Sequence, residues 1–136
     1  MHKLIKRFLP GFIFIILAIT FVLMLTGESK PLDVRTQKDV YSPDEAIVVE
    51  FSGLPGNSTD WITVVKDSTP DNQYCQWFYT QGKQCGELKF KGLPDTGNYE
   101  VRVYFNWPKE GYNVKARYPF KVKNMAGVGV KKDINK

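Results

Sequence analysis

Histidine is almost missing from this chain, and its absence limits the available chemistry. The only histidine is His2, at the N-terminus. The rest of the chain therefore cannot supply the histidine of a Ser-His-Asp or Cys-His catalytic group, or a histidine ligand for a metal. Paired carboxylates such as Asp67 and Asp71 remain, but their Ser-, Pro- and Asn-containing surroundings are typical of a polar turn. We therefore expect no enzyme, no metal and no other cofactor.

Cysteine is scarce too. The 2 cysteines, Cys75 and Cys85, lack the C-x-x-C spacing of redox and zinc motifs. In an exported domain, an even and closely spaced pair of cysteines indicates a disulfide. We predict that Cys75 and Cys85 are joined.

The chain also lacks a concentration of positive charge outside its ends, although its net charge is +5. Between residues 30 and 123 there are 13 Lys and Arg against 12 Asp and Glu, which leaves a net charge of +1. A nucleic-acid-binding domain needs a basic patch on the domain itself. We therefore expect no nucleic-acid partner.

One long apolar run is present, and it indicates a membrane segment. Residues 8–26 contain no charged side chain, whereas Lys3, Lys6 and Arg7 precede them. About 19 residues in a helix nearly cross the hydrocarbon core of a bilayer. The basic flank should keep the N-terminus in the cytoplasm and send the rest across. We predict a single-pass membrane protein, with residues 1–29 as signal-anchor and linker and its domain facing the periplasm or the cell exterior.

A cleaved signal peptide is the alternative for the same segment. Signal peptides have a shorter apolar region and a small-x-small cleavage site. The nearest such site is Gly27-Glu28-Ser29, which is a poor match, and no cysteine stands directly after the apolar segment to carry a lipid anchor. Cleavage would make the protein secreted. Both alternatives export residues 30–136.

After the apolar run there is almost no helical periodicity. Short β-rich runs alternate with Gly, Pro, Asn and Asp clusters, as is typical of an antiparallel β-sandwich. Seven strands are expected, over residues 30–40, 46–51, 61–66, 73–79, 85–91, 99–105 and 112–122. The fold class predicted is thus an all-β, immunoglobulin-like antiparallel β-sandwich over residues 30–123, preceded by one N-terminal hydrophobic helix and followed by a flexible basic tail over residues 124–136.

A local motif supports the immunoglobulin-like architecture. Tyr99 follows a Gly turn at the start of an expected strand, which is the arrangement of a tyrosine corner. Val101 stands where an immunoglobulin domain has its second cysteine. We assign Tyr99, Trp61 and Trp77 structural roles in the core or at its edge.

Several motifs together carry a family resemblance. They are Asp60-Trp-Ile62, Tyr74-x-x-Trp77-x-Tyr79, Leu93-Pro94, Gly97-x-Tyr99 and Tyr118-Pro-Phe120. Over about residues 41–122 the chain resembles the SKICH-like modules and immunoglobulin-like domains of bacterial envelope proteins. The resemblance implies a β-sandwich that binds partners or positions other domains without catalysis. SKICH modules are intracellular, so their partners are not transferred to a chain with an export segment.

Three loops are candidates for recognition. If successive strands alternate in direction, residues 53–60, 80–84 and 106–111 share one end of the sandwich, the end that antibody-like domains use for binding. The candidate binding residues at this end are Trp107, Lys109, Tyr112, Asn57 and Lys83. Alternatively, Trp107 folds back as a lid on the core. The expected function is a membrane-anchored module that binds or scaffolds another envelope protein or a glycan. The alternative function is a secreted carbohydrate-binding or inhibitor-like accessory domain.

Overall fold

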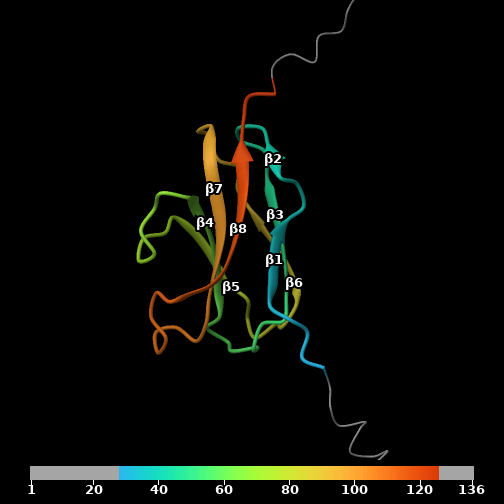
Figure 1. The fold of residues 1–136 in the computed structure, drawn as a ribbon, viewed down its shortest axis with the longest axis vertical. Coiled ribbons are helices and arrows are strands. Elements are labelled where there is room, and N and C mark those ends of the chain that lie inside the picture. Colours follow the sequence, from blue (N-terminus) through green and yellow to red (C-terminus); the bar gives the residue numbers. More distant parts are fainter. Residues whose placement is uncertain (1–27, 126–136) are drawn as a thin grey trace, which may run out of the picture.

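Eight β-strands build the part of the chain that the structure, a computed structural model, describes: residues 28–125 (Figure 1). The strands are β1 (Asp33–Thr36), β2 (Val40–Tyr41), β3 (Ile47–Ser52), β4 (Trp61–Lys66), β5 (Gln76–Tyr79), β6 (Gly86–Phe90), β7 (Gly97–Tyr104) and β8 (Val114–Val122). They form a two-sheet, all-β fold, as the sequence predicts. The expected membrane segment, residues 8–26, and most of the expected tail lie outside the described residues. Within residues 28–125, no helix has the length and apolar character needed to span a membrane.

The strands divide between a three-stranded sheet, in the order β1-β3-β6, and a five-stranded sheet, in the order β2-β8-β7-β4-β5. All pairings are antiparallel except that of β2 with β8, which is parallel. The prediction of one first strand and a purely antiparallel sandwich was therefore wrong. The chain changes sheets between Thr36 and Val40, where the Thr36 hydroxyl donates to the Lys38 carbonyl (2.6 Å).

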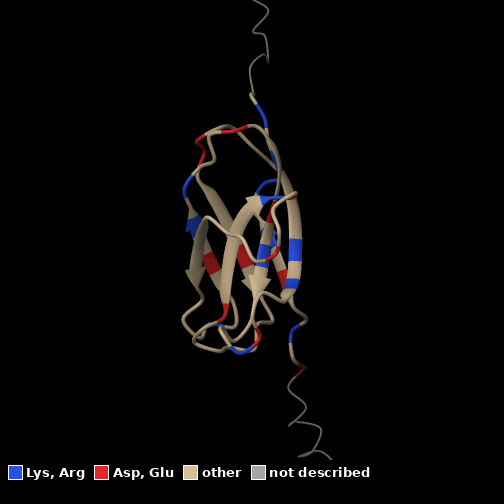
Figure 2. Ribbon diagram, turned by 90° about the vertical axis from the view of Figure 1, so that its left-hand side faces the viewer, with Lys and Arg blue, Asp and Glu red and all other residues tan. Residues whose placement is uncertain are grey.

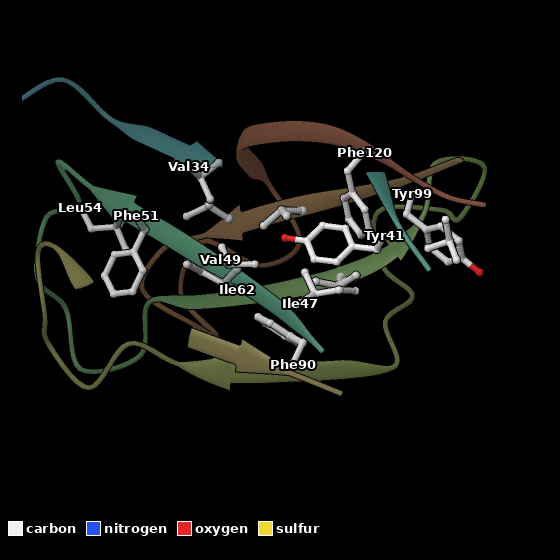
Figure 3. Packing of buried hydrophobic residues seen from close by; sticks show 14 residues of the cluster. Val34, Tyr41, Ile47, Val49, Phe51, Leu54, Ile62, Phe90, Tyr99 and Phe120 are labelled. Atoms are coloured by element: carbon white, nitrogen blue, oxygen red, sulfur yellow. The ribbon is translucent and has the colours of Figure 1, made fainter. Parts of the chain in front are cut away.

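The core lies between the two sheets and is formed by alternate residues of their strands (Figure 3). In β3, Ile47, Val49 and Phe51 are buried while the residues between them are partly exposed. This alternation is expected for a strand with one face against a core. Each fully buried Val, Ile or Phe side chain contributes about 1.5–3 kcal/mol, so this row holds the smaller sheet against the larger one.

β4 is buried on both faces, and that observation leads to the candidate site. Ile62 and Val64 belong to the core, but Trp61, Thr63 and Val65, on the opposite face, are buried as well. A central strand pairs with neighbours on both sides, here β7 and β5, but pairing does not cover its outer face. Something outside the sandwich must therefore cover the outer face of β4.

The predicted tyrosine corner is present. The Tyr99 hydroxyl donates a hydrogen bond to the Asp95 carbonyl (2.9 Å), and the Tyr99 ring is buried against Phe120. The corner fastens the turn before β7 to the strand that follows.

Tyr99→Phe keeps the ring and deletes this hydrogen bond. We expect the free energy of unfolding to fall by about 1–3 kcal/mol, because the Asp95 carbonyl loses its partner. Chemical denaturation followed by tryptophan fluorescence measures the change. Tyr118→Phe is the control, since its hydroxyl bonds only the exposed Asp39 carboxylate and its loss should change stability by less than about 1 kcal/mol. Equal stability of Tyr99→Phe and wild type would show that the corner bond contributes nothing.

The predicted disulfide is absent. Cys75 and Cys85 are both free and exposed. Cys75 precedes Gln76, whose side-chain amide bonds the backbone N–H and carbonyl of Lys91, just past the far end of β6. Cys85 lies just before the near end of β6, a strand of 5 residues. That length is about 17 Å, whereas a disulfide needs Cα atoms within about 7 Å.

The turn at residues 80–83 is the reason for this error. The sequence suggests a hairpin there, and the turn itself forms, with the Lys83 N–H donating to the Thr80 carbonyl (3.1 Å). However, β5 and β6 belong to different sheets, so the turn crosses between sheets. The two cysteines are therefore not brought opposite each other.

Candidate functional site

Two rows of side chains cross the outer face of the five-stranded sheet. In register, Trp61 of β4 lies between Tyr79 of β5 and Tyr104 of β7. Two residues further along β4, on the same face, Thr63 lies between Trp77 of β5 and Arg102 of β7. Side chains in register on one face of a sheet are neighbours. The sequence alternation of three strands thus collects aromatic rings at one place.

Trp61 forms the floor of an aromatic hollow. One face of its ring stacks on Tyr104, with ring centroids 4.0 Å apart and planes 7° apart. Four other rings lie at steep angles to it, at centroid distances of 5.2–6.4 Å. The hollow is lined by Trp61, Tyr74, Trp77, Tyr79, Trp107 and Tyr112, and it is partly open to solvent.

The surrounding rings form a continuous band. Trp107 contacts Tyr112 (4.7 Å between centroids), Tyr112 contacts Tyr74 (6.2 Å), Tyr74 contacts Trp77 (6.2 Å), and Trp77 contacts Tyr79 (4.9 Å). The Tyr74–Trp77 and Trp77–Tyr79 contacts are edge-to-face and the other two are tilted, and such contacts hold rings in defined orientations. The band is therefore an ordered surface.

The rings of the band remain open to solvent on the β5 side. Among the described residues, every exposed large hydrophobic side chain except Met125 lies between Tyr74 and Tyr79. Tyr74 is 43% exposed, Trp77 39% and Tyr79 36%, whereas Phe78, also exposed, packs against Phe90 and lines no part of the hollow. A group of exposed aromatic side chains on one face is a common mark of an interaction surface.

The loop between β4 and β5 brings Tyr74 to the hollow, and two side chains of β7 hold that loop. Arg102 is only 1% exposed and donates to the carbonyls of Thr69 (2.5 Å) and Pro70 (3.0 Å). The Tyr104 hydroxyl donates to the Asp71 carbonyl (2.7 Å). These bonds fold the loop over the outer face of β7. They also explain how an arginine and a tyrosine on that face come to be buried.

Ion pairs also attach the loop between β4 and β5 to β8. The Arg117 guanidinium lies 2.6 Å from the Asp71 carboxylate and also pairs with Glu100, which in turn accepts from Arg102. Hydrogen bonding to Arg117 holds the pKa of Asp71 below its ordinary value. The carboxylate therefore stays ionised at neutral pH, and the pair is lost only as the pH falls through that lowered pKa.

The loop between β7 and β8 brings Trp107 and Tyr112, and the buried carboxylate of Asp60 positions it. Asp60 accepts from the Asn106 N–H (3.0 Å), from the Asn57 N–H (2.9 Å) and from the Asn57 side-chain amide (2.9 Å). The Trp107 N–H donates to the Thr59 carbonyl (3.2 Å). Asp60 thus ties two of the predicted recognition loops together beside the floor of the hollow.

The three predicted loops do lie at one end of the sandwich. The Leu54 N–H donates to the Gln84 carbonyl (3.1 Å), which joins the first loop to the second, and Asp60 joins the first to the third. Figure 1 shows the chain entering the domain at this end and leaving at the other, with the loops after β4 and β7 projecting on the same side.

The hollow is electrically neutral. Its lining has neither a carboxylate nor an ammonium group, and burial together with the neighbouring Tyr74 phenol raises the pKa of Tyr112. Figure 2 shows this side of the molecule with Lys and Arg segments interspersed among Asp and Glu segments. Among residues 28–125, no group of three or more His, Cys, Asp and Glu side chains is arranged to hold a metal ion.

The predicted site residues have different places in this arrangement. Trp107 and Tyr112 are half-buried and line the hollow, where Trp107 packs toward Trp61 and is not part of the core between the sheets. Asn57 is bonded to Asp60, so its side chain is engaged within the fold. Lys109 and Lys83 are exposed in their loops and line no part of the hollow.

The structural assignment of Trp77 needs correction. Trp61 is buried, as predicted, though on the outer face of its strand, whereas Trp77 is exposed on the same face. Tyr74, Tyr79 and the anchoring residues Arg102 and Asp60 belong to the site but were not predicted as site residues. Period-two alternation was the available signal, because it places Trp61, Arg102 and Tyr104 on the face opposite the core residues of β4 and β7.

No family model matches this chain, and no curated protein matches it.

Proposed function

We propose that this protein is a non-catalytic binding module of immunoglobulin-like architecture, held at the outer face of a membrane by its N-terminal apolar segment. It binds another component of the cell envelope through the aromatic hollow. One observation supports this most: all 3 tryptophans of the chain gather in one solvent-open hollow outside the core. Large, ordered aromatic side chains often dominate the energy of recognition.

The position of the hollow fits an anchored module. The chain enters the domain at the end where the recognition loops lie (Figure 1). Residues 27–29 are the only link between the apolar segment and Lys30, and extended they span about 10 Å. In an anchored protein the hollow would therefore lie near the membrane and open parallel to its surface, toward neighbouring envelope components.

The test is a pull-down with the full-length protein. We expect the protein to remain in washed membranes, and after detergent solubilisation to retain a partner that Trp77→Ala loses, with yield falling by about tenfold. Phe78→Ala is the matched control, because Phe78 is equally exposed on the same strand but packs against Phe90, away from the hollow. Equal partner yield from wild type and Trp77→Ala would contradict the proposed site, and release into the soluble fraction would favour the secreted alternative.

A further inference from the structure

The lining of the hollow selects the chemistry of a ligand. Six aromatic rings line it, including the phenols of Tyr74, Tyr79 and Tyr112, and the lining contains no carboxylate, ammonium or guanidinium group. Ring faces pack against C–H surfaces, while phenol hydroxyls exchange hydrogen bonds with other hydroxyl groups. A matching ligand is neutral, ring-sized, apolar on its faces and hydroxylated at its edges.

An unpartnered donor adds a second requirement. Trp61 is 3% exposed, and its Nε1 is the buried side-chain nitrogen or oxygen atom without a hydrogen-bond partner among the described residues. An indole nitrogen is only a donor, and leaving it unpaired costs free energy. Trp61 lines the hollow, and the side chains around its buried N–H would have to shift for that N–H to meet a ligand. A ligand with an oxygen that accepts a hydrogen bond from this N–H would bind more tightly than one without such an oxygen.

We infer that the hollow binds a neutral pyranose unit of a carbohydrate chain. This inference rests on the proposed function and names its ligand class. The C–H face of a pyranose ring packs on an aromatic ring face, and its oxygens accept hydrogen bonds from the indole N–H and from the phenols. The hollow is partly open to solvent, and Tyr74, Trp77 and Tyr79 are exposed beside it, so a sugar unit can reach the rings while it remains part of a longer chain.

Other ligands of aromatic sites fit less well. A quaternary ammonium ion is attracted to ring faces but offers no acceptor to the Trp61 N–H, and the lining supplies no carboxylate to balance its charge. A polyproline segment needs an extended groove, which a single hollow does not supply. An acyl chain leaves the phenols and the indole N–H unused.

The three indole N–H groups make the test direct, because every tryptophan of the chain lines the hollow. Full-length protein labelled with ¹⁵N-tryptophan, in detergent micelles, is titrated with tetramers of β-1,4-linked glucose, β-1,4-linked N-acetylglucosamine and α-1,4-linked glucose. We expect at least one tetramer to shift the indole signals saturably, with a Kd of about 1 mM or tighter.

Variants identify where the sugar binds. Trp77→Ala should weaken the affinity by about tenfold, and Tyr74→Phe, which keeps the ring, by a few-fold. Phe78→Ala should bind like wild type. An unmoved Trp107 signal in unliganded Trp77→Ala shows that the variant is folded, whereas the Trp61 signal moves because it loses the neighbouring ring 6.1 Å away. If the Trp107 signal has moved, Tyr74→Phe is used for the test instead.

Two results would overturn the inference. One is the absence of any indole shift up to about 10 mM of each tetramer, a concentration at which even weak binding is visible. The other is an indole shift caused by lipid, seen when the sugar-free protein is moved from micelles to lipid nanodiscs, since the occupant would then be the membrane surface. In either case the Trp77-dependent pull-down can still succeed, so failure of the sugar assignment is separate from failure of the proposed function.

Discussion

Asp60→Ala is expected to lower the free energy of unfolding by about 4 kcal/mol, because its buried carboxylate accepts three hydrogen bonds and each N–H left unpaired costs about 1–3 kcal/mol. The loss should also disorganise the hollow, since Asp60 ties the loop of Trp107 to the loop of Asn57. Urea denaturation of the full-length protein in detergent, followed by tryptophan fluorescence, measures the stability.

Two further variants make the Asp60 result specific. Asp60→Asn keeps the size of the side chain and one acceptor oxygen. It should therefore lower the free energy of unfolding by about half as much as Asp60→Ala. Asp67→Ala, at an exposed carboxylate in a turn, should change stability by less than about 0.5 kcal/mol. A loss below about 1 kcal/mol in Asp60→Ala would mean that the loops hold together without the carboxylate.

Arg102→Met should have the second-largest effect, a loss of about 3 kcal/mol or more. Methionine approximates the length of the side chain but leaves the Thr69 and Pro70 carbonyls unbonded and Glu100 without one of its two cations. The loop between β4 and β5 should detach, and its amide protons should exchange faster with solvent than those of the core strands. Hydrogen exchange read by mass spectrometry separates this local release from global unfolding.

Arg35→Met is the matched control for Arg102. Arg35 also pairs with a glutamate, Glu50 (2.9 Å), but its side chain is 60% exposed. An exposed pair of this kind contributes less than about 1 kcal/mol. Equal effects of Arg35→Met and Arg102→Met would show that the buried guanidinium does not hold the loop.

The sequence predicts the limits of a strand well where an apolar run is bounded on both sides by turn-forming residues. The limits of β4 coincide with the prediction because an apolar run is bounded by Asp60 and Asp67. The tyrosine corner is likewise a local pattern, in which the bond partner lies 4 residues away. Such features depend on neighbouring residues and are readable without knowing the fold.

The errors concern contacts between distant segments. Nothing near Cys75 or Cys85 indicates that β5 and β6 enter different sheets, so a short separation was taken for spatial proximity. Trp77 was placed in or at the core because aromatic strands are commonly buried, but the register opposite Thr63 turns it outward. The hollow itself needs two loops to fold over β4, and those loops are held by Arg102 and Asp60 across 33 and 46 residues of chain respectively.

The opposite positions of the two chain ends have a mechanical consequence. β1, β2 and β8 all run from the end where the chain enters toward the end where it leaves (Figure 1), and β2 lies parallel to β8. A pull between an anchored N-terminus and anything attached beyond β8 would draw β2 and β8 in opposite directions along their length. Their hydrogen bonds would then be strained together in shear, a geometry that resists extension better than the one-by-one opening of a hairpin pulled from its free ends.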